Sequence, residues 1–283
     1  KHFNCALQRR IFKILYYLYL NKRFKILLTF IKEKPLRVII WKAYCKIFNG
    51  KIPHSDSWIS LVKDKSGLEI GGPSGIFSKK NYLPIYPFIK SLDGVNFSNK
   101  TIWEGEIEQG NNYLYDGKKG FQFIAEGTNL NQIKNDTYDF LLSCNNLEHI
   151  ANPIKSLLEW KRVIKNGGCI ILILPGKESN FDHKRLITSF NHLKNDFENN
   201  TGENDLTHLE EILELHDLKR DSHAGSFADF KKRSLDNFEN RSLHHHVFDI
   251  LLLEEMINYI GMKVLISHSS PTDHFIAASK IEE

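Results

Sequence analysis

Short apolar runs recur through the middle of the chain, and each ends in glycine or polar residues. The last run, residues 169–174, is continuously apolar and is closed by Pro175 and Gly176. This pattern is typical of a central parallel strand that is covered on both faces. The earlier runs lie at residues 68–70, 94–97, 121–124 and 138–143.

A helical pattern lies between the last two of these runs. Apolar residues recur near the helical period from 154 to 163, Asn152 can cap the helix and Pro153 suits its first turn. The glycine pair at 167–168 should end it. The order of strand, helix and strand predicts a doubly wound, mostly parallel α/β sheet.

The C-terminal part returns to the sheet. Residues 249–260 have helical periodicity and end at Gly261, and residues 263–266 and 275–278 resemble two strands joined by a Ser-Ser-Pro turn. We therefore expect a helix followed by a C-terminal antiparallel hairpin.

Residues 68–75, Leu-Glu-Ile-Gly-Gly-Pro-Ser-Gly, carry an apolar strand directly into a glycine-rich turn. Glycine lets the backbone approach a ligand, and a helix starting just beyond would direct its free N–H groups at that ligand. A side chain at Gly71 or Gly75 should collide with the ligand or the turn. Because Pro73 stands where a dinucleotide motif has its middle glycine, a purely structural turn stays an alternative. Asn96 lies about 20 residues on, where such folds place a side chain that holds ribose.

Three further motifs follow in order. Residues 139–143 read Asp-Phe-Leu-Leu-Ser, residues 147–149 read Leu-Glu-His, and residues 162–168 read Arg-Val-Ile-Lys-Asn-Gly-Gly. With the glycine-rich turn, this ordered set resembles the class I S-adenosylmethionine-dependent methyltransferases over roughly residues 66–176. The resemblance implies a Rossmann-like methyltransferase fold and S-adenosylmethionine as the cofactor. It implies that Glu69, Gly71 and Gly75 surround the methionine part, that Asn96 holds the ribose and that Asn129 and Leu130 contact the adenine, with Gly72 and Asn145 completing the cofactor-binding set.

Two residues depart from the family pattern. Pro73 replaces a usual glycine, and Asn96 replaces a usual acid, so that a ribose contact would lose the roughly twofold strength of a charge-assisted bond. A catalytically silent, methyltransferase-like binding module is therefore one alternative. A nicotinamide-dependent oxidoreductase is another, although the missing middle glycine and the Leu-Glu-His segment argue against it.

The insertion at residues 177–248 is crowded with histidines and acids, and we expect it to cover the site as a substrate lid. Because the sulfonium already activates the methyl group, the protein has to align the acceptor and remove a proton. His149 is the first candidate base, followed by Asp182 and His183. The alternative for His149 is a hydrogen bond to the backbone. His208 and His246 are expected to bind the acceptor, which we predict to be a hydroxyl of a glycan, a lipid-linked sugar or a small metabolite.

Although His and Asp are good metal ligands, we expect solvated or hydrogen-bonded histidines in this insertion and no metal site, on the ground that no pair has the i, i+4 spacing of a helical zinc motif. The four cysteines, Cys5, Cys45, Cys144 and Cys169, have no paired spacing, which favours a reduced, cytoplasmic setting. Cys144 lies next to the predicted site and is interpreted as a small buried apolar residue.

The first 60 residues differ from the remainder in charge. Residues 1–63 hold 14 Lys or Arg and two acids, a net +12, whereas the other residues hold 24 and 32, a net −8. Lysines interrupt the apolar residues of 11–31, which excludes a transmembrane helix there, and a signal peptide and nucleic-acid binding are also disfavoured. We predict a basic amphipathic arm, residues 1–60, that either contacts the anionic inner face of the membrane or packs on a methyltransferase domain formed by residues 61–283.

Overall fold

The computed structural model describes residues 35–48 and 50–281. Most of the predicted N-terminal arm, residues 1–34, therefore lies outside the described residues. Helices α3 (Leu36–Phe48) and α4 (Ser55–Val62) precede the sheet. None of the helices in the described ranges combines the length and the apolarity needed to cross a bilayer.

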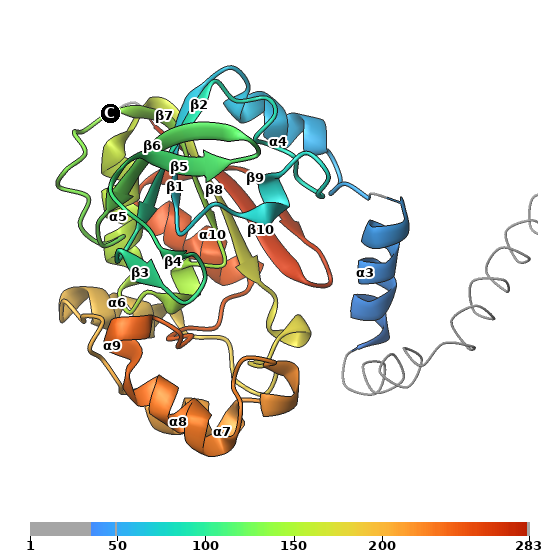
Figure 1. The fold of residues 1–283 in the computed structure, drawn as a ribbon, viewed down its shortest axis with the longest axis vertical. Coiled ribbons are helices and arrows are strands. Elements are labelled where there is room, and N and C mark those ends of the chain that lie inside the picture. The colour runs from blue at the N-terminus through green and yellow to red at the C-terminus, as the bar shows by residue number, and fades with distance from the viewer. Residues whose placement is uncertain (1–34, 49, 282–283) are drawn as a thin grey trace, which may run out of the picture.

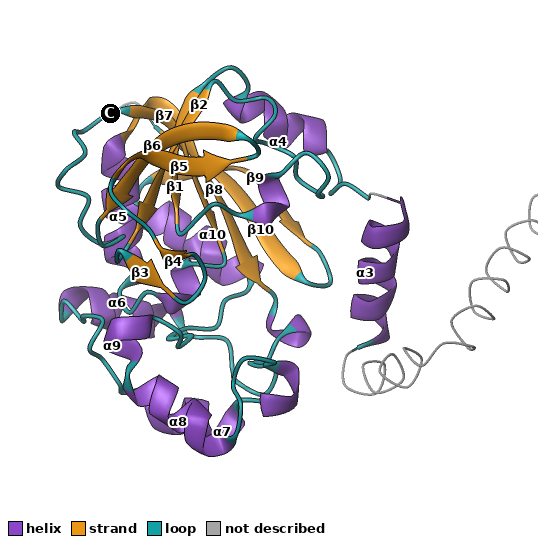
Figure 2. Ribbon diagram, in the orientation of Figure 1, coloured by secondary structure: helices purple, strands orange, loops and turns teal. Residues whose placement is uncertain are grey.

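One large sheet forms the centre of the described part of the chain (Figures 1 and 2). Its eight strands follow the order β5-β6-β2-β1-β7-β8-β10-β9. The five strands from β6 to β8 run parallel, whereas β10 is antiparallel to both β8 and β9, and β5 is antiparallel to β6. The strands are β1 (Ser66–Ile70), β2 (Ser91–Asn96), β5 (Gly110–Tyr115), β6 (Lys118–Ile124), β7 (Tyr138–Cys144), β8 (Ile164–Pro175), β9 (Met262–Ser269) and β10 (Asp273–Lys280); β3 (Lys100–Thr101) and β4 (Gly105–Glu106) form a separate pair.

This architecture confirms the predicted doubly wound sheet and its C-terminal hairpin. The helix expected after Asn152 is α5 (Pro153–Val163), and the Asn152 side chain accepts a hydrogen bond from the Lys155 N–H. It ends before the glycine pair because β8 already begins at Ile164. Helix α10 (Ile250–Tyr259) begins after Asp249, which caps it in the same way.

Apolar residues cover the sheet on both faces, because successive side chains of a strand point to opposite sides. On β8, Ile170 packs in a cluster with α5 and α10, and Ile171 packs in the opposite cluster with α4 and β5. Ile52 and Trp58 belong to this second cluster, and the Trp58 ring meets Phe275 at 6.2 Å between centroids. The buried core of the domain thus includes residues that the sequence pattern assigned to the arm.

The segment after the glycine-rich turn differs from the expectation of a helix. Only a three-residue 3-10 helix, η1 (Gly75–Phe77), follows the turn. Pro84 and Pro87 come soon afterwards, and proline in a helix interior removes a hydrogen bond and clashes with the preceding turn. The irregular segment instead contributes Ile85 and Tyr86 to the core.

The insertion forms a small helical lobe at one end of the sheet. Figure 1 shows its helices gathered beyond the end toward which β8 points. Since β1, β2 and β7 are paired so that Ile70 aligns with both Val95 and Ser143, the carboxyl ends of these strands face this lobe at the same level. The lobe contains η3 (Lys177–Ser179), α6 (Phe190–Glu198), α7 (Leu209–Leu215), η4 (Leu218–Arg220), α8 (Phe227–Leu235) and α9 (Asn237–Asn240).

Candidate functional site

The glycine-rich turn leaves β1 at Gly71, which has a φ of +75°. A Cβ atom at this position would lie 2.4 Å from Nδ2 of Asn146, so both the backbone conformation and the space require glycine. Gly75 is different, because a Cβ atom there would have no described atom within 4 Å. The expectation that a side chain at Gly75 would collide with the turn is therefore wrong, and only a ligand could require glycine there.

Glu69 lies under this turn and is fully buried. Its Oε1 accepts a hydrogen bond from the Ser74 N–H at 3.0 Å, and its Oε2 accepts one from the hydroxyl of Tyr86 and one from that of Tyr113, each at 2.7 Å. The carboxylate therefore ties the turn to β5 and to the segment before β2. Its role is to shape the turn, since Glu69 is absent from the described cavity wall.

A cavity of about 580 Å³ lies between the carboxyl ends of the strands and the insertion. Its volume is in the range of small-molecule sites, and parallel sheets bind ligands at this edge. Of the predicted cofactor residues, four line the cavity: Gly71, Gly75, Asn96 and Asn145.

The other predicted cofactor residues, apart from Glu69, are Gly72, Asn129 and Leu130, and these too are absent from the described cavity wall. Leu130 is fully buried in the core, and its N–H donates to Glu159 Oε1. The residues of this loop that do line the cavity come directly after β6 and are Ala125, Glu126 and Gly127.

Asn96 combines a place on the cavity wall with a structural contact. It ends β2, is almost completely buried, and its Nδ2 donates to the Gly72 carbonyl at 3.1 Å. The amide thereby stabilises the turn through a hydrogen bond that a carboxylate at this position could not donate.

Two histidines meet where the insertion reaches the sheet. His149, in η2 (Leu147–His149) after β7, packs its ring against His244 with centroids 4.6 Å apart and against Trp103 at 5.3 Å. His149 Nδ1 lies 3.0 Å from the Leu243 carbonyl and must donate to it, which is the backbone contact named as the alternative for this residue. Both histidines line the cavity.

Asp182 forms a hydrogen bond with the second of these histidines, His244. Its Oδ2 accepts from Nδ1 of His244 at 2.5 Å, and its Oδ1 lies 3.1 Å from Nη1 of Arg185. All three side chains are buried. The structure thus brings two of the three predicted catalytic residues, His149 and Asp182, to the same place and adds His244 between them.

Burial sets the electrostatics of this cluster. It raises the pKa of Glu148 to about 7, and it lowers the pKa of His149 well below its usual range, helped by the charge of His244. Burial also opposes the charge on His244, but the hydrogen-bonded Asp182 outweighs it and raises the pKa of His244. Ligand atoms of Glu148, His149 and His244 lie within 4.8 Å of one another, so this group has the composition of a metal site.

The remaining predicted residues lie elsewhere. His183 pairs with Asp217 at 2.9 Å and is absent from the described cavity wall. His208 and His246 are absent from it too, and their ring centroids lie 5.3 Å apart. Burial raises the pKa of Cys144, which lines the cavity, well above its usual value, so the thiol is uncharged as expected for an apolar residue.

Sequence reasoning missed His244, Trp103 and Arg241. Residues 244–246 are three consecutive histidines, and nothing in the sequence pattern shows which ring faces the cavity. Arg241 forms ion pairs with Glu126 at 2.7 Å and with Glu203 at 2.9 Å, joining the insertion to the β6 loop. Such contacts depend on tertiary structure and have no local signal.

Comparison with known proteins agrees with this geometry. Residues 68–172 match the family described as a methyltransferase domain. An uncharacterized protein of Methanocaldococcus jannaschii is 34% identical over 114 residues, covering 40% of this chain and 46% of the relative. The chain thus matches about half the length of that curated relative.

Partial structural similarity is also found to solved structures of low sequence identity. A chain from the complex between the Trm112 methyltransferase activator and a methyltransferase of Haloferax volcanii has a TM-score of 0.46 at 9% identity, covering 85% of this chain and 93% of that chain. An S-adenosylmethionine-dependent methyltransferase of Methanosarcina mazei has a TM-score of 0.44 at 14% identity, covering 82% and 100%. One from Aquifex aeolicus has a TM-score of 0.42 at 13% identity, covering 81% and 90%.

The family match covers β1 to β8, with the glycine-rich turn and the cavity at the strand ends inside or beside it. Residues 68–172 of this chain are therefore similar to a methyltransferase domain, and this similarity indicates S-adenosylmethionine as the cofactor.

Proposed function

We propose that this chain transfers a methyl group to a hydroxyl oxygen of a polar acceptor, a glycan, a lipid-linked sugar or a small metabolite. His244 removes the hydroxyl proton, and Asp182 positions the ring of His244. The observation that carries this proposal is the 2.5 Å contact between Asp182 Oδ2 and His244 Nδ1 on the wall of the cofactor cavity.

The cofactor end of the cavity lies at the glycine-rich turn. Gly71, Gly75 and Asn96 would hold S-adenosylmethionine there, together with residues 125–127. The fit rests on Gly71, where a Cβ atom would close the turn. When bound, the sulfonium supplies an activated methyl group, and the protein contributes alignment and proton removal.

The base follows from the direction of one hydrogen bond. Because a carboxylate only accepts, Nδ1 of His244 carries a proton in both charge states, and in the neutral ring the lone pair that can take the acceptor proton lies on Nε2. A carboxylate that fixes the tautomer and the orientation of a histidine is the arrangement used by hydrolases to prepare a general base. Arg185 holds Asp182 in place through Nη1 and is itself anchored on the carbonyls of His244 and His245.

The acceptor part of the wall mixes polar and aromatic groups. Asn180 and Glu203 offer hydrogen-bonding groups, whereas Trp103 and Phe181 offer ring faces. Amides and carboxylates bind hydroxyls, and aromatic rings pack on the C–H surface of a sugar. This composition favours a polyhydroxylated acceptor over a purely apolar one.

The test begins with calorimetry of S-adenosylmethionine on the purified chain, followed by release of S-adenosylhomocysteine with a panel of sugars, sugar nucleotides and lipid-linked sugars. With an active acceptor in hand, His244→Gln and Asp182→Asn should lower kcat by about 10²- to 10⁴-fold and leave the Kd of S-adenosylmethionine close to that of the wild type. His183→Gln is the control, because His183 pairs with Asp217 away from the cavity wall.

Three results would contradict the proposal in separable ways. Absence of S-adenosylmethionine binding would remove the activity itself. Binding without turnover on the whole panel would favour a silent binding module. Full activity of His244→Gln would show that the proton leaves by another route.

A further inference from the structure

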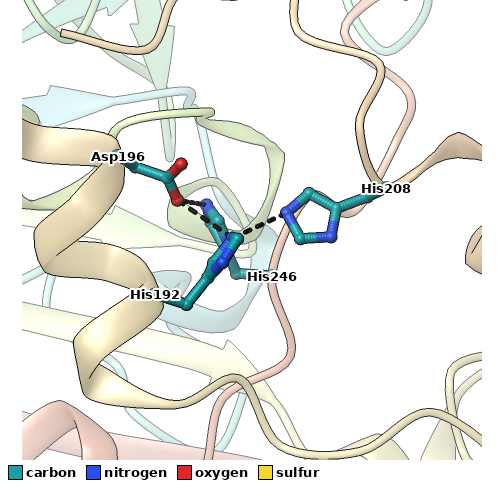
Figure 3. A group of neighbouring side chains, drawn as sticks. All are labelled: His192, Asp196, His208 and His246. Carbon is teal, nitrogen blue, oxygen red and sulfur yellow. Dashed lines mark hydrogen bonds and ion pairs between the residues drawn. The ribbon is translucent and has the colours of Figure 1, made fainter. Parts of the chain in front are cut away.

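A second group of histidines lies inside the insertion, away from the cavity wall. Figure 3 shows His192 and Asp196 projecting from one side of α6 toward His208 and His246. His208 comes directly before α7, and His246 belongs to the segment that returns to the sheet before α10. Three segments that are far apart in the sequence therefore converge on one point.

The distances in this cluster suit a shared ion. His192 Nε2 lies 2.9 Å from His208 Nε2 and 3.2 Å from Asp196 Oδ2, and His246 Nε2 lies 3.6 Å from the same Oδ2. One ligand atom from each of the four residues lies within 4.8 Å of the other three. Zinc binds nitrogen and oxygen at about 2.0–2.2 Å, so neighbouring ligands of a tetrahedral site lie about 3.3 Å apart.

Asp196 lacks a cationic partner at this point. Its Oδ2 is buried, has no hydrogen-bond partner among the described residues, and faces the imidazoles of His192 and His246. Neutral imidazoles and a carboxylate are the protonation states in which these groups bind metals.

We propose that His192, Asp196, His208 and His246 bind a divalent transition-metal ion, with Zn²⁺ as the best match to three imidazoles and one carboxylate. Side chains of the protein supply all four positions, as in structural zinc sites, whereas catalytic sites keep a position open. None of the four residues is among those that line the described cavity. The ion is therefore structural and does not take part in methyl transfer.

The proposed ion would fasten the insertion to the domain. The Asp196 carbonyl accepts from Nδ2 of Asn152 at 2.9 Å, which holds the cluster against the start of α5. His246 Nε2 lies 3.1 Å from the Ala151 carbonyl, and it can either donate to that carbonyl or bind the ion. His244, two residues before His246, reaches the cavity. An ion at this position would fix α6, the start of α7 and the histidine run together.

The spacing of His192 and Asp196 places both side chains on one face of a helix, four residues apart. The expectation that the insertion lacks an i, i+4 pair of possible ligands is therefore wrong. The two distant partners of this pair become apparent only in the folded chain.

The test measures the metal content of the full-length chain after purification without an affinity tag that binds metal. We expect about one zinc ion per chain by elemental mass spectrometry, removal by a strong chelator, and a lower Tm of the chelated protein that added Zn²⁺ restores. Replacement by Co²⁺ should give the intense visible absorption of tetrahedral cobalt.

Two variants and two controls locate the ion. Loss of a residue that only supports a metal ligand weakens metal binding by ~10- to 100-fold. Asp196→Asn and His208→Ala change the ligands themselves, so each should weaken Zn²⁺ binding by more than this. His223→Ala, an exposed histidine of the same insertion, should keep the metal content of the wild type. Glu148→Gln tests the other candidate group, and it should keep the metal as well.

Several outcomes would overturn the proposal. Absence of bound metal together with absence of Zn²⁺ binding by the chelated protein would leave only a hydrogen bond between His192 and His208. Loss of the metal from Glu148→Gln, with retention in His208→Ala, would place the ion at the cavity. If Asp196→Asn and His208→Ala fail to fold, cobalt absorption of the wild-type protein still decides the coordination.

Discussion

Glu148 is a buried acid whose ionisation destabilises the folded protein. This effect on the free energy of unfolding can be measured without knowledge of the methyl acceptor. Glu148 is 2% exposed, and neither carboxylate oxygen has a hydrogen-bond partner among the described residues. Burial is the main cause that raises its pKa to about 7, with His244 acting in the opposite direction and Asp182 and Asp273 adding to the rise. We therefore expect the folded protein to prefer protonated Glu148.

The size of the effect follows from linkage. The interval between the ordinary value of 4.5 and about 7 corresponds to about 3 kcal/mol, since each pH unit is worth about 1.4 kcal/mol. The folded pKa is raised, so this contribution to the free energy of unfolding is fully present below pH 4.5 and is lost as the pH rises to about 7. Glu148→Gln removes the titration but keeps the size of the side chain.

Urea unfolding of both proteins between pH 4.5 and 8 tests this reasoning. The variant should gain about 3 kcal/mol relative to the wild type across this range, with the gain complete near pH 8. Glu159 provides a control of opposite sign, because hydrogen bonds from Arg162 lower its pKa, and Glu159→Gln should therefore lose stability relative to the wild type above pH 4.5. Parallel curves for the wild type and Glu148→Gln would refute the argument.

Further predictions concern the turn, the cap and the arm. Gly71→Val should destabilise the fold by about 2 kcal/mol or more through its positive φ, whereas Gly75→Val should unfold like the wild type and bind S-adenosylmethionine at least about 10-fold more weakly; an unchanged Kd would exclude Gly75 from the cofactor site. Asn152→Ala should cost about 1–2 kcal/mol in urea unfolding because it removes the cap of α5, and Asn152→Asp should recover the cap; equal loss in both would point to the amide contact with Asp196 instead. The basic arm should sediment the chain with anionic vesicles at low salt, each Lys or Arg contributing about 1 kcal/mol, and deletion of residues 1–50 should abolish this; no difference between the two chains would remove the membrane role.

The sheet could be predicted from sequence because its strands are buried on both faces and appear as continuous apolar runs. Strand β8 and helix α5 show this, since residues 169–174 of the strand are uniformly apolar and the helix carries its own cap at Asn152. Strand β5 gave no such signal, because only two of its residues, Tyr113 and Tyr115, are buried and it depends on pairing with β6. The missing helix after η1 was foreseeable from Pro84 and Pro87.

Residues of the site could be predicted only where their position follows from the local sequence pattern. Gly71 and Asn96 lie at the ends of strands whose order the sequence indicates, and both line the cavity. His244 could not be selected among three adjacent histidines, because its partner Asp182 is 62 residues away in the chain. Leu130 was expected to contact the adenine, but its side chain is buried in the core. The position of a residue next to a loop does not show whether its side chain points into the cavity or into the core.

The three hydrogen bonds on Glu69 have a consequence for the thermodynamics of cofactor binding. The carboxylate holds Ser74 and the two tyrosines without any contribution from a ligand, so the conformation of the turn does not depend on a bound ligand. A preorganised site loses little conformational entropy when it is filled, and more of the contact energy appears as affinity. The weaker amide at Asn96 can thus be compensated by a turn that does not have to be ordered on binding.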